Sequence, residues 1–270
     1  MVVTGASDFV SYDSILLKHA APAPRAYVLF HGLTASPPQF AAFGRLLFDR
    51  GADVFIPRLP HHGYGDRLTS ALEYLTVAEL RAFARESVET ALGLARDVRV
   101  VGFSVGGLLA AWIGQRHPVT RATAIAPFLG LSWFPPQLTA TAASLLLRFP
   151  NRYLWWDPLR REGLMPAHGY PRFPTHAIAV AAQLGQELMR EAALRAPAAG
   201  DVQIVLNASE AAVSNSAGRE LARSWARTTH QRIVLHQVKG LPASHDIIEP
   251  LRHPAIVRRV YPALVDLVDR

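Results

Sequence analysis

Short apolar runs alternate along this chain with longer stretches whose apolar residues recur at helical spacing. The short runs predict strands at residues 25–31, 52–57, 97–101, 122–126, 202–206 and 232–238. The longer stretches predict helices at about residues 37–50, 77–96, 104–117, 216–229 and 254–270. Strands that alternate with helices form a mostly parallel sheet covered on both faces, so the pattern predicts an α/β fold.

Local signals mark several of the expected helix ends. Ser36 is expected to be an N-cap, with Pro37 at the first helical position, and Gly51 is expected to end that helix. Thr76 and Glu79 have the spacing of a capping box.

The alternation is interrupted between about residues 128 and 200. A structureless loop of this length is rare in a compact domain, so we expect a separate cap subdomain here. Helices are expected in it near residues 136–149 and 175–195. The predicted organisation is therefore an α/β core (residues 1–127 and 201–270) with an inserted cap (residues 128–200).

The composition is that of a globular protein, with 50% hydrophobic and 18% charged residues among 270. This balance excludes a disordered or collagen-like chain. The net charge is +7, and all cations except Lys18 and Lys239 are arginines. These arginines are scattered rather than clustered, so we expect solvated surface charges and no nucleic-acid partner.

The chain contains no cysteine, which excludes thiol nucleophiles, disulfides and thiolate metal sites. Residues 1–20 lack the basic start and apolar run of a secretory signal, and no apolar run approaches the roughly 20 residues needed to span a bilayer. We therefore expect a cytoplasmic protein with no stable membrane insertion, although earlier processing would leave no trace. The sequence leaves the oligomeric state open.

The segment Gly102-Phe103-Ser104-Val105-Gly106-Gly107 carries the strongest chemical signal. It follows a predicted strand and opens a predicted helix, which is the context that a G-x-S-x-G nucleophile motif requires. A tight turn of this kind exposes the serine hydroxyl, and the helix N-terminus behind it favours developing negative charge. Ser104 is therefore the candidate nucleophile.

A second glycine motif, His31-Gly32-Leu33-Thr34, follows the first predicted strand of the sheet interior. The backbone N–H groups of Leu33 and Val105 are the candidate oxyanion hole. Gly32 is expected to let the chain turn without placing a side chain in the pocket, and His31 is expected to have a structural role.

With these motifs the chain resembles the α/β-hydrolase superfamily, and in particular its serine carboxylesterase and lipase-like members. The resemblance extends to residues 57–63 (PRLPHHG) and to the expected cap. In that family the catalytic acid and the histidine follow the serine in chain order. The resemblance implies that His245, in the loop after the last strand, is the general base; His253 is its nearest competitor. Glu210 is the implied acid, because its loop contains no aspartate, and Asp246 is the alternative.

Other histidines suggest no metal site. His61 and His62 are adjacent, so they point in different directions in extended chain, and no carboxylate cluster with ligand spacing accompanies them. His168 and His176 lie in the expected cap and are read as incidental. We expect neither a metal nor a cofactor.

Aromatic residues in the expected cap are the candidate substrate pocket: Trp133, Phe134, Trp155 and Trp156. Some of them could instead only fasten the cap to the core. A serine nucleophile implies acyl transfer through an acyl-enzyme, so we expect a hydrolase acting on small hydrophobic carboxylic esters, with short-to-medium acyl chains or monoglycerides. An acyl-CoA thioesterase and a non-catalytic ligand-binding protein remain alternatives.

Overall fold

The structure is a computed structural model that describes residues 11–161, 165–229 and 231–270. Part of the N-terminal stretch that was read for a signal sequence, residues 1–10, lies outside the described residues. Among the described residues, no helix is long and apolar enough to cross a bilayer.

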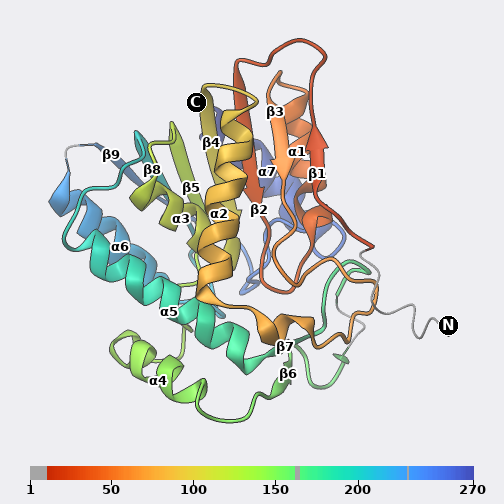
Figure 1. Cartoon of the computed structure of the whole chain (residues 1–270), viewed down its shortest axis with the longest axis vertical. Helices are drawn as coiled ribbons and strands as arrows, with labels where there is room; N and C mark the ends of the chain where they lie inside the picture. The colour runs from red at the N-terminus through yellow and green to blue at the C-terminus, as the bar shows by residue number, and fades with distance from the viewer. Residues whose placement is uncertain (1–10, 162–164, 230) are drawn as a thin grey trace.

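A seven-stranded sheet with the order β1-β3-β2-β4-β5-β8-β9 forms the centre of the described chain (Figure 1). β1 pairs antiparallel with β3, and the other neighbouring strands pair in parallel. The predicted α/β fold with a mostly parallel sheet is therefore confirmed. The strands are β1 Ile15–Leu17, β2 Arg25–Phe30, β3 Asp53–Ile56, β4 Asp97–Phe103, β5 Arg121–Ile125, β8 Asp201–Asn207 and β9 Arg232–Val238.

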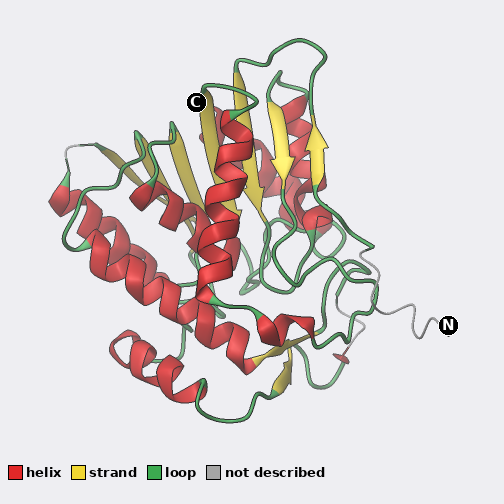
Figure 2. Cartoon of the chain, viewed as in Figure 1, coloured by secondary structure: helices red, strands yellow, loops and turns green. Residues whose placement is uncertain are grey.

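Helices cover both faces of this sheet (Figure 2). One face carries α1 (Ala41–Phe48) and α7 (Pro254–Asp269), which pack against each other. Among the other helices, α2 packs against α3, α3 against α5, and α5 against α6. Figure 1 shows α2 and α7 on opposite faces of the sheet. These helices are α2 Val77–Leu92, α3 Val105–Arg116, α5 Thr175–Ala192 and α6 Asn215–Thr228.

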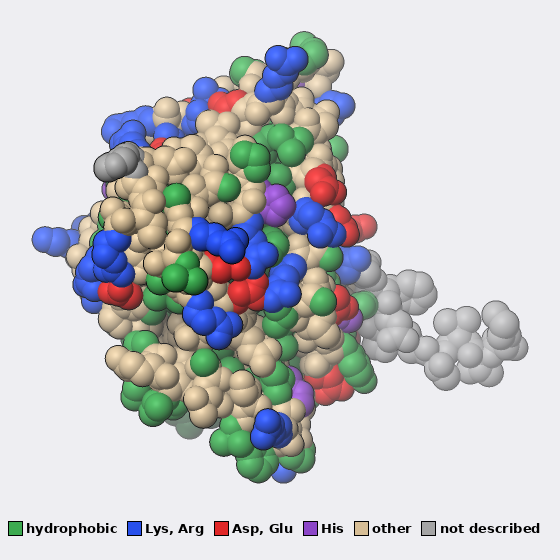
Figure 3. Space-filling model, turned by 60° about the vertical axis from the view of Figure 1, so that its left-hand side comes forward, with side chains coloured by type: hydrophobic (Ala, Val, Ile, Leu, Met, Phe, Trp, Pro, Cys, Tyr) green, Lys and Arg blue, Asp and Glu red, His purple; other side chains and the backbone are tan. Residues whose placement is uncertain are grey.

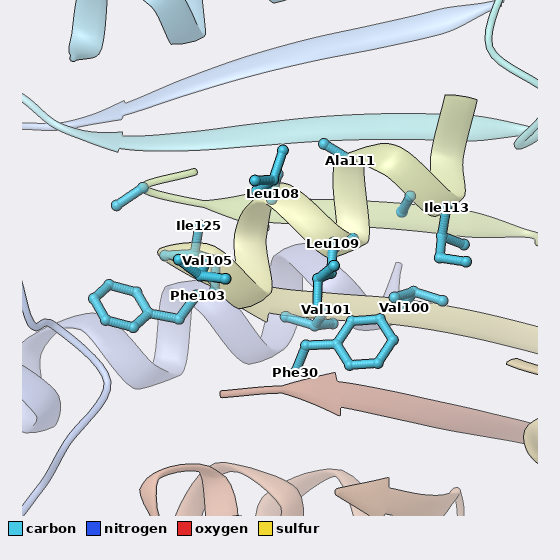
Figure 4. Close-up of a cluster of buried hydrophobic side chains, with 14 of the residues drawn as sticks. Phe30, Val100, Val101, Phe103, Val105, Leu108, Leu109, Ala111, Ile113 and Ile125 are labelled. Atoms are coloured by element: carbon cyan, nitrogen blue, oxygen red, sulfur yellow. The ribbon is translucent and has the colours of Figure 1, made fainter. Parts of the chain in front are cut away.

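One part of the hydrophobic core lies where α3 packs on the middle of the sheet. Leu108 and Leu109 of α3 lie against side chains of β2, β4 and β5, among them Phe30 and Ile125 (Figure 4). All four are completely buried. Because β4 and α3 are both fixed by this packing, the turn that joins them is held between two rigid elements.

Both predicted N-cap residues, Thr76 and Ser36, stand at the start of a helix, but only Thr76 caps its helix with the side chain. Thr76 Oγ1 accepts from the Glu79 N–H and a Glu79 carboxylate oxygen accepts from the Thr76 N–H, which completes the predicted capping box. Ser36 precedes a short 3₁₀ helix, η1 (Pro37–Phe40), but its side chain does not cap it. Its hydroxyl donates instead to the His168 carbonyl at 2.8 Å, because this end of η1 is buried against residues 168–170.

The expectation of solvated arginines is wrong for two of them. Arg99 and Arg121 are buried near the start of β4 and at the start of β5. Both donate to the carbonyl of Val268 in the last turn of α7, at 2.9 and 3.2 Å. Charged donors at a helix C-terminus satisfy its free carbonyls and complement its dipole, which offsets the cost of burying them. On the face of the molecule shown in Figure 3, Lys and Arg side chains lie beside Asp and Glu side chains.

β5 and β8 are direct neighbours in the sheet, so the long segment between them is inserted between two adjacent strands. In this segment α5 packs against α3 and α6, whereas α4 packs against α5. An antiparallel hairpin of β6 and β7 was not expected from the sequence. The division into core and cap at residues 128 and 200 remains a prediction. The remaining elements are η2 Ala71–Tyr74, η3 Pro136–Leu138, α4 Thr139–Leu146, β6 Tyr153–Trp155 and β7 Arg172–Pro174.

Candidate active site

Ser104 lies in the sharp turn between β4 and α3. Its backbone dihedral angles are φ 57° and ψ −117°, a conformation that is strained for a residue with a side chain. The Ser104 N–H donates to the Ile125 carbonyl and the Ser104 carbonyl accepts from the Phe128 N–H, both at 2.9 Å. These bonds to the last residue of β5 and to the chain after it hold the strained turn in place.

The glycines on either side of Ser104 are required by close backbone approach. A Cβ atom at Gly102 would lie 1.9 Å from the Gly106 carbonyl oxygen. A Cβ atom at Gly106 would lie 2.0 Å from the Phe30 carbonyl oxygen in β2. The x-Ser-x turn can therefore fold back on its strand and pack against β2 only with glycine at both positions.

Ser104, His245 and Glu210 form one hydrogen-bonded chain across three loops. His245 Nε2 lies 2.8 Å from Ser104 Oγ, and His245 Nδ1 lies 2.9 Å from Glu210 Oε2. The three residues follow β4, β9 and β8 respectively, at the carboxyl edge of the parallel sheet, where sites of α/β proteins form. If Nδ1–H donates to the carboxylate, Nε2 is free to accept the serine proton.

Glu210 has the surroundings of an ionised carboxylate. Burial acts to raise its pKa, but the hydrogen bond and charge of His245 and the N–H groups of Ala212 and Val213 outweigh burial and lower the pKa below its ordinary value. The side chain has no exposed surface. A fixed negative charge next to Nδ1 stabilises a protonated imidazole ring.

Leu33 and Val105, the candidate oxyanion residues, are both buried. Val105 is the first residue of α3, so its N–H has no carbonyl within the helix to bond to. The peptide before Leu33 is fixed through its carbonyl, because Gly32 O accepts from the Ala35 N–H at 3.1 Å and lies 2.9 Å from His31 Nδ1. A planar trans peptide points its N–H opposite to its carbonyl, so these contacts also fix the direction of the Leu33 N–H.

His31 is completely buried under this loop, as its expected structural role requires. Its Nε2 accepts from the Leu59 N–H at 3.2 Å, so Nδ1 is the protonated nitrogen that donates to Gly32 O. Burial and the neighbouring His62 lower its pKa well below the usual histidine range, which keeps the ring neutral. The nearest contacts of a Cβ atom at Gly32 would be Phe103 and Gln39, at ordinary distances of 3.5 Å and more, so close packing does not require glycine at this position.

The competing residues for the triad lie elsewhere. Asp246 is buried and accepts from the N–H groups of Ile248 and Glu249, both at 2.9 Å, so its carboxylate closes the loop after His245. His253 Nε2 lies 3.0 Å from Ser244 Oγ at the start of α7.

The side chains of the adjacent His61 and His62 contact different partners. His61 Nε2 lies 3.0 Å from Glu79, whereas His62 contacts the carbonyls of Pro60 and Leu33. Burial lowers the pKa of His62 to about 4. No group of three or more potential metal ligands occurs in the described part of the chain.

Among the candidate pocket aromatics, Trp156 is the one that reaches the loop after Leu33. Its Nε1 donates to Thr34 Oγ1 at 2.7 Å. Trp155 lies under the guanidinium of Arg161, and Trp133 packs edge-on against Phe134 with 73% of its own surface exposed. Two cavities lie elsewhere: one of about 440 Å³ lies between β9 and α7, and one of about 390 Å³ is lined by α4 and Arg148.

Two buried polar contacts near the triad were not expected from the sequence. Gln39 in η1 contacts both Gly32 and Asp246. His168 Nε2 lies 2.9 Å from a Glu249 carboxylate oxygen, although their orientation is not that of a hydrogen bond. The only sequence signal for the contacts of Gln39 and His168 was a polar residue within an apolar stretch.

Comparison with known proteins identifies the fold. The profile of the α/β hydrolase fold family matches residues 27–157. No curated protein matches the sequence.

Solved structures match over almost the whole chain at low sequence identity. A monoacylglycerol lipase from Paleococcus ferrophilus superposes with a TM-score of 0.70 at 19% identity, covering 95% of this chain and 98% of that one. A soluble variant of the monoglyceride lipase from Saccharomyces cerevisiae gives a TM-score of 0.71 at 15% identity, covering 95% and 91%. A structure from a study of the metagenome-derived lipolytic enzymes LipS and LipT gives 0.69 at 16%, covering 95% and 98%. By its sheet order and these matches, the chain has the α/β-hydrolase fold.

Proposed function

We propose that this protein is a serine hydrolase that cleaves carboxylic esters through an acyl-enzyme intermediate. The observation that carries the proposal is the hydrogen-bonded chain Ser104–His245–Glu210, built on a strained strand-to-helix turn. The similar structures named as lipases agree with this reading but establish only the fold.

The proposed mechanism follows from the direction of each hydrogen bond. His245 Nε2 takes the proton of Ser104 Oγ as the oxygen attacks the ester carbonyl carbon. The N–H groups of Leu33 and Val105 stabilise the oxyanion, and the charge of Glu210 stabilises the protonated imidazole. When the intermediate collapses, the C–O bond to the alcohol breaks and His245 returns its proton to the leaving alkoxide. Water, deprotonated by His245, then attacks the acyl carbon and releases the carboxylic acid.

We further propose that residues 128–200 act as a cap over this site. Support comes from contacts between the segment and the loop after Leu33: the Tyr170 N–H donates to Thr34 O, and Trp156 donates to the Thr34 hydroxyl. Leu131 also forms a bridge with Val213 in the loop of Glu210. The aromatic residues of this segment, Trp156 first among them, support a hydrophobic ester with a short-to-medium acyl chain, or a monoglyceride, as substrate.

The test is hydrolysis of a p-nitrophenyl ester series from acetate to palmitate, together with a monoacylglycerol, by the parent protein and by Ser104→Ala. We expect a maximum at short or medium chains and a loss of at least a thousand-fold in the variant, in line with removal of a triad member. Labelling by a fluorophosphonate probe should likewise require Ser104. A parent that is inert to every ester would overturn the proposal; cleavage of acyl-CoA alone would then favour a thioesterase, and no reaction at all would favour a binding protein.

A further inference from the structure

Gln39 is a buried side chain that spans two parts of the candidate active site. It is 3% exposed and lies in η1, the 3₁₀ turn that follows the oxyanion loop. Its Oε1 accepts from the Gly32 N–H at 2.9 Å, and its Nε2 donates to Asp246 Oδ2 at 3.0 Å. One amide group therefore joins the loop before Leu33 to the loop that carries His245.

On the oxyanion side, Gln39 completes the restraint of a glycine. The carbonyl of Gly32 is held by Ala35 and His31, and its N–H is held by Gln39. Glycine has more backbone freedom than any other residue, so both of its peptide planes must be fixed if the Leu33 N–H is to keep one direction. Oxyanion donors act only when they are already aimed at the position where the charge develops.

On the base side, Gln39 fixes the residue next to the imidazole. The Asp246 carboxylate receives three N–H groups: those of Ile248 and Glu249 on Oδ1 and that of Gln39 on Oδ2. The two backbone bonds shape the loop internally, whereas Gln39 ties that loop to η1. A hydrogen bond from an amide to a buried carboxylate is charge-assisted and is therefore stronger than one between neutral groups.

We infer that Gln39 is a positioning residue that sets the oxyanion donor Leu33 and the base His245 relative to each other. This inference rests on the proposed ester-hydrolase function. It assigns to a residue that touches no reacting atom a role in kcat rather than in substrate binding.

The first variant is Gln39→Met, which keeps the length of the side chain and removes both hydrogen bonds. We expect kcat for a p-nitrophenyl ester to fall on the order of 10-fold to 100-fold, below the 10²–10³ that follows loss of an oxyanion donor itself, with KM within about 2-fold of the parent. The matched control is Gln115→Met. Gln115 is also buried and also bonds on both sides, to Arg195 O and Trp225 Nε1, but it lies near the far end of α3. Its variant should lose thermal stability and keep kcat.

A reciprocal exchange distinguishes positioning from general damage. Gln39→Glu keeps the acceptor for Gly32 but places a second carboxylate against Asp246, so kcat should fall. Adding Asp246→Asn returns a donor to the pair, now from residue 246 to residue 39, and should restore kcat to within about 5-fold of the parent because the lost charge-assisted geometry is rebuilt.

The outcomes distinguish the positioning role of Gln39 from the proposed ester-hydrolase function. An active parent with unchanged kcat in folded Gln39→Met, or a double variant no better than Gln39→Glu, would overturn the role of Gln39 alone. A parent inert to every ester would overturn the hydrolase function and this role together. If Gln39→Met does not fold, the comparison of Gln39→Glu with the double variant decides.

Discussion

At the scale of single residues, the candidate site depends on the strained backbone conformation of Ser104. A non-glycine residue in the backbone conformation of Ser104 costs on the order of 1–3 kcal/mol. The bonds of Ser104 to Ile125 at the end of β5 and to Phe128 after it, and the absence of Cβ atoms at Gly102 and Gly106, make this turn possible. The packing around the turn thus stabilises a backbone conformation that serine would not adopt by itself.

Substitution by alanine should lower the free energy of unfolding strongly at Gly106, where a Cβ atom would clash with the backbone, and only weakly at Gly32, where it would not. Gly106→Ala would place a methyl group 2.0 Å from the Phe30 carbonyl oxygen, so β2 or α3 must move. We expect a loss of about 3 kcal/mol or more in the free energy of unfolding, at the upper end for overpacking. The control is Gly32→Ala, whose methyl group would meet Phe103 at 3.5 Å and should change stability by less than about 1 kcal/mol. Denaturant unfolding measures both, and equal losses would contradict the assignment of the close approach to Gly106.

Glu210→Gln should separate charge from shape in the triad. The amide keeps the side-chain volume but cannot stabilise the imidazolium, so we expect kcat to fall on the order of 10³–10⁴. Glu210→Asp, which keeps the charge, should lose less. Steady-state kinetics with one ester measures both variants, and a Gln variant as active as the Asp variant would remove Glu210 from the mechanism.

The same residue should contribute to stability in a pH-dependent way. Because the folded state lowers the pKa of Glu210, its ionised form stabilises the protein above the unfolded pKa of about 4.3 and ceases to do so as the pH falls through the lower, folded value. The stability difference between the parent and Glu210→Gln should therefore be full at neutral pH and shrink below about pH 4.3. Unfolding in denaturant at a series of pH values measures it; a difference that grows on acidification would contradict the lowered pKa.

At the scale of elements, strands and helices with strong local signals could be predicted from the sequence, and contacts between distant segments could not. The apolar runs of β2, β4 and β8 and the capping box of α2 were identified correctly because their signals are local. β1, with three residues, is too short to show a periodicity. Ser104 was identified from its motif, and Glu210 and His245 from the resemblance to the α/β-hydrolase family. Gln39 has no local signal, because its partners lie 7 and 207 residues away.

The cap of α2 offers a test confined to one element. Thr76→Ala removes the acceptor for the Glu79 N–H and should lower the free energy of unfolding by about 1 kcal/mol. Thr90→Ala, in the last turn of the same helix, removes an exposed hydroxyl that donates to Glu86 O and should have an effect within about 0.5 kcal/mol. Ester hydrolysis should be unchanged in both, because α2 contributes no group to the triad.

At the scale of the whole molecule, the last turn of α7 joins strands that lie far apart in sequence. Arg25 of β2, Arg99 of β4 and Arg121 of β5 donate to carbonyls in the span Leu267–Asp269. Tyr27 of β2 also donates to Val268 O. The amino ends of three central strands are thereby tied to the end of one helix.

Removal of one of these arginines should destabilise the entire fold. Arg99→Met keeps the aliphatic stem but removes the bonds of Arg99 to the Val268 carbonyl and to Asp97, so we expect a loss of about 2 kcal/mol or more in the free energy of unfolding, typical of hydrogen bonds to a charged group. The control, Arg223→Met, removes an exposed ion pair of α6 with Glu220 and should cost less than about 1 kcal/mol. Similar losses in the two variants would contradict a structural role for the arginine–α7 contacts.

These arginine contacts also bear on how the chain acquires its structure during translation. When β2, β4 and β5 have left the ribosome, the acceptors of Arg25, Arg99 and Arg121 in residues 267–269 have not yet been synthesised. One of the two neighbours of β5 in the sheet, β8, is also separated from it by a long stretch of chain, so completing the sheet requires contacts of high sequence separation. Until residues 267–269 are made, Arg25 and Arg99 have Asp97 as a partner and Arg121 awaits Asp201, so the contacts that tie these strands to α7 form late.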